Sequence, residues 1–251
     1  MKEPLASRSG LVIVEDAAAL VHALADRFVE SARDAIAERA RFDVSLSGGS
    51  TPRDAYAMLA DEPLRNSLDW SKVRFFFGDE RCVPPGDAQS NYNMARTALF
   101  EPLAIPQSQI FRIRGEDEPS AAARAYADVL KTELGPNPVF DLILLGMGPD
   151  GHTASLFPGS DPCEDDEALV RAPYVQKFAA YRITITPRVI NAAREVVLAA
   201  GGAEKAAAIT RALEGPHDPV QCPVQIVGPA DGCLTWIVDR LAAGRLRGRT
   251  I

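Results

Sequence analysis

Apolar residues in this chain follow two different spacings. Short branched or aromatic runs, typical of buried strands, alternate with longer stretches in which apolar residues recur every three or four positions, as on one face of a helix. The clearest helical stretch follows Asp16, which can cap it. Its apolar face is expected to carry Leu20, Leu24, Phe28, Ala32 and Ile36.

These patterns predict an ordered series of elements. Strands are expected at residues 42–46, 73–77, 142–145, 182–185, 196–199 and 234–238. Helices are expected at about residues 52–60, 91–99, 119–134, 188–193 and 203–213. Strands that alternate with helices are typical of βα units around a mainly parallel sheet, so the predicted fold class is α/β.

The sequence between these elements predicts no domain boundary. Residues 161–167 and 215–223 have the composition of surface connections, and there is no internal repeat. We therefore expect one domain over residues 1–251, with Arg245, Arg247 and Arg249 in a solvated tail.

Composition excludes several classes of protein. The chain has 251 residues, 47% of them hydrophobic, and a formal net charge of -7, so it lacks the basic surface that nucleic-acid binding requires. No apolar run approaches the roughly 20 residues that cross a bilayer, and residues 1–6 lack the apolar core of a secretory signal. We expect a cytoplasmic protein with no membrane partner. Its scattered cysteines predict neither a zinc site nor a redox pair: Cys82, Cys163, Cys222 and Cys233.

A glycine-rich turn follows the first predicted strand. In the segment Ser47-Gly-Gly-Ser-Thr-Pro52, Gly48 and Gly49 allow a close approach to the backbone, Ser50 or Thr51 can cap a helix, and Pro52 suits its first position. Free amides at the positive end of a helix favour a phosphate. The alternative is a capped turn that binds nothing. Because no Gly-Lys-Ser/Thr follows, a nucleotide P-loop is excluded.

Charged residues end the second predicted strand. Asp79, Glu80 and Arg81 come directly after Phe75-Phe-Phe-Gly78, so one or two of them should face the carboxyl edge of the sheet. Arg81 suits an anion or a developing oxyanion, although an internal cluster of ion pairs is the alternative. The Ser90–Tyr92 segment can close over the same cleft, or simply cap a helix.

The apolar run 142–145 ends in the turn Gly146-Met-Gly-Pro-Asp-Gly-His152. Its glycines match the dinucleotide pattern Gly-x-Gly-x-x-Gly, but Pro158 and Gly159 interrupt the helix which that pattern requires, and no acid follows a second strand. What remains is one imidazole at the end of a strand, a side chain of the type that transfers protons near neutral pH. That position favours proton transfer by His152 over a structural role.

Two cations lie near later strands. Lys205 falls in the first turn of a predicted helix after Gly201-Gly202, where a cation opposes the helix dipole unless an anion compensates it. Arg182 opens the strand 182–185 and can supply a second charge. Either side chain could equally face solvent.

Four separated blocks carry a resemblance to a known family. Residues 47–52, 78–81 with 90–92, 146–159 and 201–205 resemble, in order, the signature blocks of the 6-phosphogluconolactonase family. The resemblance implies a Rossmann-like, mainly parallel sheet with helices on both faces, as in glucosamine-6-phosphate deaminase, ribose-5-phosphate isomerase and CoA transferases. It also implies metal-free, cofactor-free opening of 6-phosphoglucono-1,5-lactone, the second step of the pentose phosphate pathway.

The resemblance implies a role for each candidate residue. His152 would act as general base on water, and Arg81 would stabilise the oxyanion. Asp150 or Asp79 would orient His152 or hold sugar hydroxyls. The phosphate would be held by the turn at 48–51 with Lys205, Arg182 or both. We expect a monomer or a weak homo-oligomer.

Two alternatives remain at this stage. The related deaminases carry a glutamate five residues after the histidine, where this chain has Phe157, and that difference favours the lactonase. A non-catalytic sugar-phosphate sensor would need a DNA-binding segment, for which the region before Leu11 is expected to be too short.

Overall fold

Six parallel strands form the central sheet of the computed structural model, which describes residues 9–160 and 167–247. The strand order is β1-β10-β9-β5-β2-β3, and every neighbouring pair is parallel. The interior strands are buried along most of their length, as expected when helices cover both faces. The bounds are β1 Ser9–Val14, β2 Phe42–Leu46, β3 Val73–Phe77, β5 Leu142–Gly146, β9 Glu195–Ala200 and β10 Cys233–Asp239.

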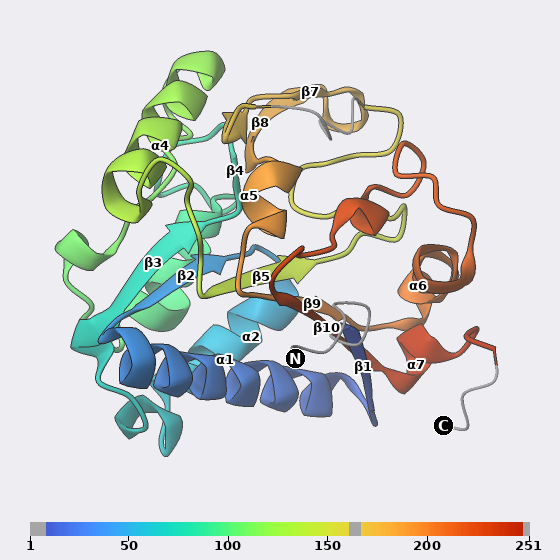
Figure 1. The fold of residues 1–251 in the computed structure, drawn as a ribbon, viewed down its shortest axis with the longest axis horizontal. Coiled ribbons are helices and arrows are strands. Elements are labelled where there is room, and N and C mark those ends of the chain that lie inside the picture. The colour runs from blue at the N-terminus through green and yellow to red at the C-terminus, as the bar shows by residue number, and fades with distance from the viewer. Residues whose placement is uncertain (1–8, 161–166, 248–251) are drawn as a thin grey trace.

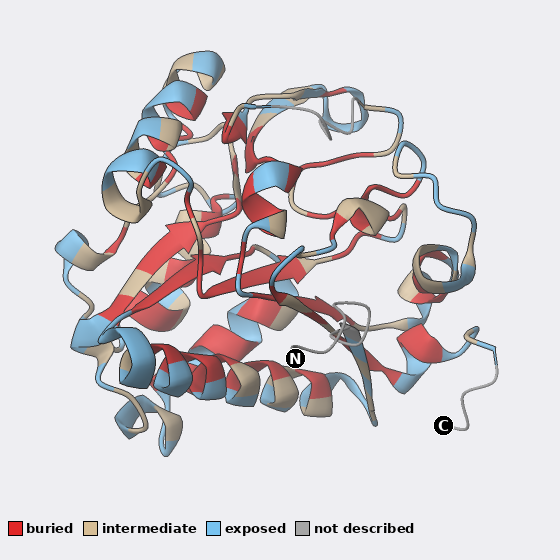
Figure 2. Ribbon diagram, in the orientation of Figure 1, coloured by how far each residue is buried: buried red, intermediate tan, exposed pale blue. Residues whose placement is uncertain are grey.

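Helices lie on both faces of this sheet (Figure 1), as predicted. α1 (Ala17–Arg39) and α2 (Ser50–Ala60) lie beneath the sheet in this view, and α5 (Pro187–Asn191) lies above it. Figure 2 shows that the face of α1 turned toward the sheet is buried. Asp16 caps α1 as expected, since its Oδ1 accepts a hydrogen bond from the amide of Ala19 at 2.9 Å. The remaining α-helices are α3 (Asn91–Ala95), α4 (Pro119–Leu134), α6 (Ala206–Glu214) and α7 (Arg240–Ala243).

Some predicted helices contain tighter or wider turns. The predicted helix 91–99 is α3 followed by a π-helical turn, Arg96–Phe100, and the predicted helix 203–213 is a 3-10 turn, Ala203–Lys205, followed by α6. Other 3-10 turns are Leu64–Asn66, Trp70–Lys72, Gln107–Gln109, Gln176–Phe178 and Pro223–Ile226.

The strand predicted at residues 182–185 is present, but it is not part of the parallel sheet that the alternating pattern favoured. This strand, β8 (Ala180–Ile185), lies outside the main sheet and pairs antiparallel with β4 (Asp79–Arg81), β6 (Val170–Arg171) and β7 (Tyr174–Val175). An apolar run identifies a strand but not its neighbour. The sequence analysis also missed β1, a partly exposed edge strand in which Val12 is 44% exposed.

The direction of chain travel across the sheet reverses between β2 and β5. From β2 the chain moves outward to β3, whereas from β5 it moves the other way to β9 and β10. Loops that leave the carboxyl ends of β2 and β5 therefore separate, and open α/β sheets bind ligands in the crevice that results. The predicted motifs at residues 47–52 and 146–152 both begin there.

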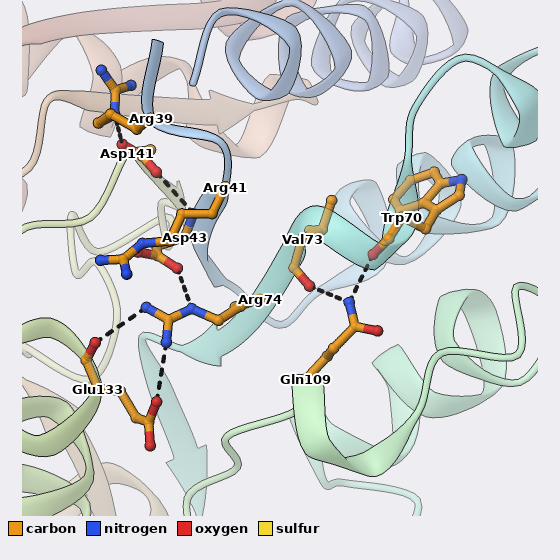
Figure 3. Close-up of polar contacts among 9 residues, drawn as sticks. All are labelled: Arg39, Arg41, Asp43, Trp70, Val73, Arg74, Gln109, Glu133 and Asp141. Carbon is orange, nitrogen blue, oxygen red and sulfur yellow. Dashed lines mark hydrogen bonds and ion pairs between the residues drawn. The ribbon is translucent and has the colours of Figure 1, made fainter. Parts of the chain in front are cut away.

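Buried ion pairs hold the opposite, amino ends of the same strands (Figure 3). Asp141 accepts hydrogen bonds from Arg39 Nε at 2.9 Å and from the amide of Asp43 at 2.9 Å. Asp43 accepts from Arg74 Nε at 2.6 Å, and Arg74 also contacts Glu133. This network joins β2, β3 and β5 at the end away from the predicted motifs.

We expect Asp141→Ala to destabilise the fold by about 2 kcal/mol, because the buried amide of Asp43 loses its acceptor. The two arginine partners of Asp141, Arg39 and Arg194, are both partly exposed and can be solvated again. Urea unfolding followed by circular dichroism measures the change. Asp128→Ala, at an exposed carboxylate 4.0 Å from Lys131, is the control and should leave stability unchanged. Equal stabilities of the two variants would contradict the structural role of Asp141.

The structure also bears on the predictions for the cysteines and for membrane spans. Cys82, Cys222 and Cys233 form no disulfide, whereas Cys163 and Arg249 lie outside the described residues, as do residues 161–166 of the predicted surface connection. Within the described ranges, no helix is long and apolar enough to span a bilayer.

Candidate functional site

A cavity of about 300 Å³ lies at the carboxyl edge of the sheet, where the chain reverses direction. Its walls come from the segments that follow β2, β5 and β9, together with β4 and the start of α3. The lining residues are Ser47–Pro52, Asp79, Arg81, Asn91, Gly146–Gly148, His152, Ala154, Ala199–Gly201, Glu204 and Lys205.

One wall is the turn from β2 into α2. The prediction that Ser50 or Thr51 caps this helix was wrong, because α2 begins at Ser50 and Gly49 occupies the N-cap position with a φ of 111°. Only glycine adopts such a φ readily. Pro52 therefore sits in the first turn rather than opening it. The amides of Ser50 and Thr51 have no partner within the helix, so this wall presents donors and the positive end of a helix dipole.

The second wall comes from β4, whose side chains alternate. Asp79 and Arg81 line the cavity, whereas Glu80 points the other way and is buried. Burial raises the pKa of Glu80, although hydrogen bonds from the amides of Tyr92, Asn91 and Arg81 oppose that rise. The buried carboxylate thus holds the segment 90–92 against β4.

Asn91 is a cavity residue that the sequence analysis did not select. Its Nδ2 donates to the carbonyl and to Oδ1 of Asp79, at 2.9 and 3.1 Å. A Cβ on Gly48 would lie 2.0 Å from Asn91 Oδ1, so only glycine lets the β2 turn approach this side chain. The sequence signal was the Ser90–Tyr92 motif, which indicated closure over the cleft but not which side chain enters it. Ser90 also caps α3, accepting from the amide of Asn93 at 3.1 Å.

The third wall is the turn after β5, which carries His152. Residues 147–152 form turns rather than a helix, so the dinucleotide reading of the glycine pattern fails here as expected. Nδ1 of His152 lies 2.5 Å from Oδ1 of Asp150. A Cβ on Gly148 would lie 2.1 Å from that same Nδ1, so this glycine makes room for the pair.

Asp150 is held ionised by its neighbours. Burial acts to raise its pKa, but hydrogen bonds from Lys177 and His152 outweigh burial and hold the pKa well below its ordinary value. An ionised Asp150 accepts only, so the neutral imidazole carries its proton on Nδ1. Nε2, on the far edge of the ring, is then the basic atom available to the cavity.

Phe157 fixes the plane of the imidazole. The two rings stack with centroids 4.3 Å apart and an interplanar angle of 29°. Phe157 is buried, so it gives His152 an apolar backing on one face. The ring is therefore restrained both by Asp150 at its edge and by Phe157 at its face.

Of the two predicted cations near later strands, only Lys205 lines the cavity. It sits at the N-cap position of α6 and lines the same cavity as the β2 turn, as does its neighbour Glu204. Arg182 lies on β8 opposite Arg81, and its guanidinium stacks on Phe178 at 5.1 Å. Burial and the charge of Arg81 lower the pKa of Arg182.

The structure thus brings most of the predicted site residues together. Gly48, Gly49, Ser50, Thr51, Asp79, Arg81, His152 and Lys205 all line the cavity. Asp150 contacts His152 but does not line the cavity, and Arg182 lies beside Arg81 of β4 without lining it. The sequence analysis did not select Asn91, Lys177 or Ser155, whose Oγ donates to Asp79 Oδ2 at 2.6 Å.

Comparison with known proteins gives the following matches. A family model described as glucosamine-6-phosphate isomerases/6-phosphogluconolactonase matches residues 15–236. A 6-phosphogluconolactonase of Treponema pallidum is 42% identical over 197 residues, which cover 77% of this chain and 80% of the relative.

Solved structures of similar proteins share the fold. The 6-phosphogluconolactonase from Trypanosoma cruzi superposes with a TM-score of 0.85 at 30% identity, over 96% of this chain and 97% of that chain. A monomeric glucosamine-6-phosphate deaminase superposes with a TM-score of 0.81 over 94% and 99% of the two chains, but at 19% identity it shows the shared fold alone. The predicted Rossmann-like α/β fold is therefore confirmed.

Proposed function

Because this chain belongs to the family of glucosamine-6-phosphate isomerases and 6-phosphogluconolactonases, we propose that it opens 6-phosphoglucono-1,5-lactone to 6-phosphogluconate, in the pentose phosphate pathway. One observation carries the proposal for the site: His152, paired with Asp150, lines the same cavity as a helix-terminal anion cradle. The histidine suits ester hydrolysis, and the start of the helix suits a phosphate.

The phosphate lies between the β2 turn and Lys205. The amides of Ser50 and Thr51 and the dipole of α2 supply the fixed part of this site. Lys205 supplies a full charge from the facing segment. Arg182 acts at longer range, through its position beside Arg81. Within an acidic protein, these groups confine a doubly charged ligand to one end of the cavity.

His152 activates the water. Its Nε2 takes a proton from a water molecule as the oxygen attacks C1 of the lactone, and Asp150 stabilises the resulting imidazolium. A new bond forms between the water oxygen and C1, and the carbonyl becomes a tetrahedral oxyanion.

Arg81 stabilises that oxyanion, and His152 completes the reaction. Arg81, which lines the cavity, donates toward the developing negative charge. When the bond between C1 and the ring oxygen breaks, the imidazolium returns its proton to the ring oxygen. Asp79 and Asn91, joined by hydrogen bonds, are placed to hold the sugar hydroxyls. The new carboxylic acid then releases one proton to solvent.

Acid release by the purified protein tests this function. The lactone is generated enzymically and its opening is followed by titration at constant pH, with the spontaneous rate subtracted. We expect turnover of the phosphorylated lactone well above turnover of unphosphorylated gluconolactone. Ammonia release from glucosamine 6-phosphate, with no effect on the lactone, would assign the cavity to the deaminase reaction instead. The apolar Phe157 behind His152 supports the lactonase.

The reaction needs no metal in this proposal, since side chains supply the base, the oxyanion donor and the phosphate ligands. In the part of the chain that the structure describes, no group of three or more His, Cys, Asp or Glu is arranged to hold a metal ion. We therefore expect full activity after dialysis against a chelator. The acid-release assay with and without EDTA measures this, and a loss that added Mg²⁺ or Zn²⁺ restores would contradict it.

One domain over residues 1–251 carries this activity in the proposal, as a monomer or weak homo-oligomer in the cytoplasm. Specific activity that does not change with protein concentration, together with mass from light scattering, tests this point.

A further inference from the structure

Lys177 contacts the carboxylate that orients His152. It belongs to the 3-10 turn Gln176–Phe178, and its Nζ donates to Oδ2 of Asp150 at 2.9 Å. The other oxygen, Oδ1, lies 2.5 Å from Nδ1 of His152. One carboxylate is therefore shared between a cation and the imidazole, with one oxygen for each.

The position of Lys177 separates it from the substrate. It does not line the 300 Å³ cavity that holds His152 and Lys205. It lines instead a neighbouring cavity of about 260 Å³, which Asp150 and Phe157 also border. The direct polar contact by which Lys177 reaches the reacting groups is therefore the one with Asp150.

The same turn supports the imidazole a second time, through aromatic packing. Phe178 meets Phe157 edge-on with ring centroids 5.6 Å apart, and Phe157 stacks on His152. The Nζ of Lys177 lies 5.5 Å from the centroid of Phe178. An ionic contact and an apolar contact thus link this turn to the edge and the face of one ring.

We infer that Lys177 is a positioning residue for the proposed lactonase reaction, which acts through Asp150 to keep His152 oriented and its Nε2 unprotonated. The inference rests on the proposed function. By occupying Oδ2, the ammonium prevents the carboxylate from rotating away from Nδ1. It also keeps Asp150 ionised, so Asp150 can accept only and the imidazole proton stays on Nδ1.

The sign of the pH effect follows from the charges around Asp150. Among the described residues, its charged or titratable contacts are His152, Lys177 and Arg211, and Arg211 from α6 reaches only the backbone carbonyl, at 2.6 Å. Removal of the ammonium makes the surroundings of the Asp150–His152 pair more negative, so the pair binds a proton more tightly. The basic form of the site is then lost at a higher pH.

The experiment compares Lys177→Met and Lys177→Arg with the wild type across pH. We expect Lys177→Met to lower kcat about tenfold, with little change in KM, and to move the acid limb of the kcat profile to higher pH. Lys177→Arg should restore most of kcat and bring the acid limb of the kcat profile back to the pH seen in the wild type. Lys131→Met is a matched control, because Lys131 is equally exposed at 54% and also lies beside an aspartate.

A double-mutant cycle with Asp150→Asn shows whether Lys177 acts through Asp150. If it does, Lys177→Met should cause no further loss in the Asp150→Asn background. Multiplied losses with a raised KM would overturn the inference and assign Lys177 to the substrate. A wild-type kcat and acid limb in Lys177→Met would overturn it as well. Absence of lactone turnover in the wild type is a separate result, which rejects the proposed function itself.

Discussion

Replacement of His152 by alanine is expected to lower kcat for the phosphorylated lactone by about 10²- to 10⁴-fold, the usual contribution of a positioned general base. Nε2 of His152 is the basic atom which the pairing of Nδ1 with Asp150 leaves available to the cavity. The variant keeps the phosphate site, so KM should change little. The loss should therefore fall on turnover and not on binding.

Acid release at constant pH measures this effect after subtraction of spontaneous opening. His22→Ala is the control, because His22 is an exposed residue on α1, remote from the cavity. Circular dichroism should show that both variants fold as the wild type does, since the imidazole of His152 is one-quarter exposed and leaves no buried cavity. Undiminished turnover in His152→Ala would remove the general-base mechanism.

Replacement of Lys205 by alanine is expected to raise KM for the phosphorylated lactone by about tenfold to a hundredfold, the range for loss of a hydrogen bond to a charged group. Lys205 lines the same cavity as the first turn of α2, and both the ammonium and the free amides favour a dianion. Chemistry occurs at the other end of the substrate, so kcat should fall much less than KM rises.

Two comparisons isolate the phosphate contact. Unphosphorylated gluconolactone should be opened equally well by the wild type and by Lys205→Ala, because it lacks the group that the ammonium binds. Lys72→Ala removes an exposed lysine from a 3-10 turn that does not border the cavity, and should leave KM unchanged. A KM that rises equally for both lactones would place Lys205 at the sugar ring instead of the phosphate.

The local elements and their chemistry could be predicted from the sequence. The strands at 42–46 and 73–77 and the helix at 119–134 agree with the structure residue for residue, because short branched runs and a 3.6-residue period are local properties. The strand-end position of His152 also followed from its place after an apolar run. Parallel strands bring their carboxyl ends to one edge, which is why separated motifs could be expected to meet.

Contacts between distant segments needed the tertiary structure. The start of α2 is set by the φ of Gly49 and not by the capping tendency of Ser50. Strand β8 leaves the main sheet because β4, which is only three residues long, offers it an antiparallel partner. That pairing is what places Arg182 beside Arg81 and outside the residues that line the cavity.

The sequence by itself determined which residues can form strands and helices, and which residue types can carry acid-base and anion chemistry at the strand ends. Only the tertiary structure decided which of these side chains share a cavity, since strand order, backbone φ and side-chain direction depend on contacts between remote segments. It united the turn of Gly48–Thr51 with Lys205 and His152, and it placed Lys177 on Asp150, 27 residues away along the chain.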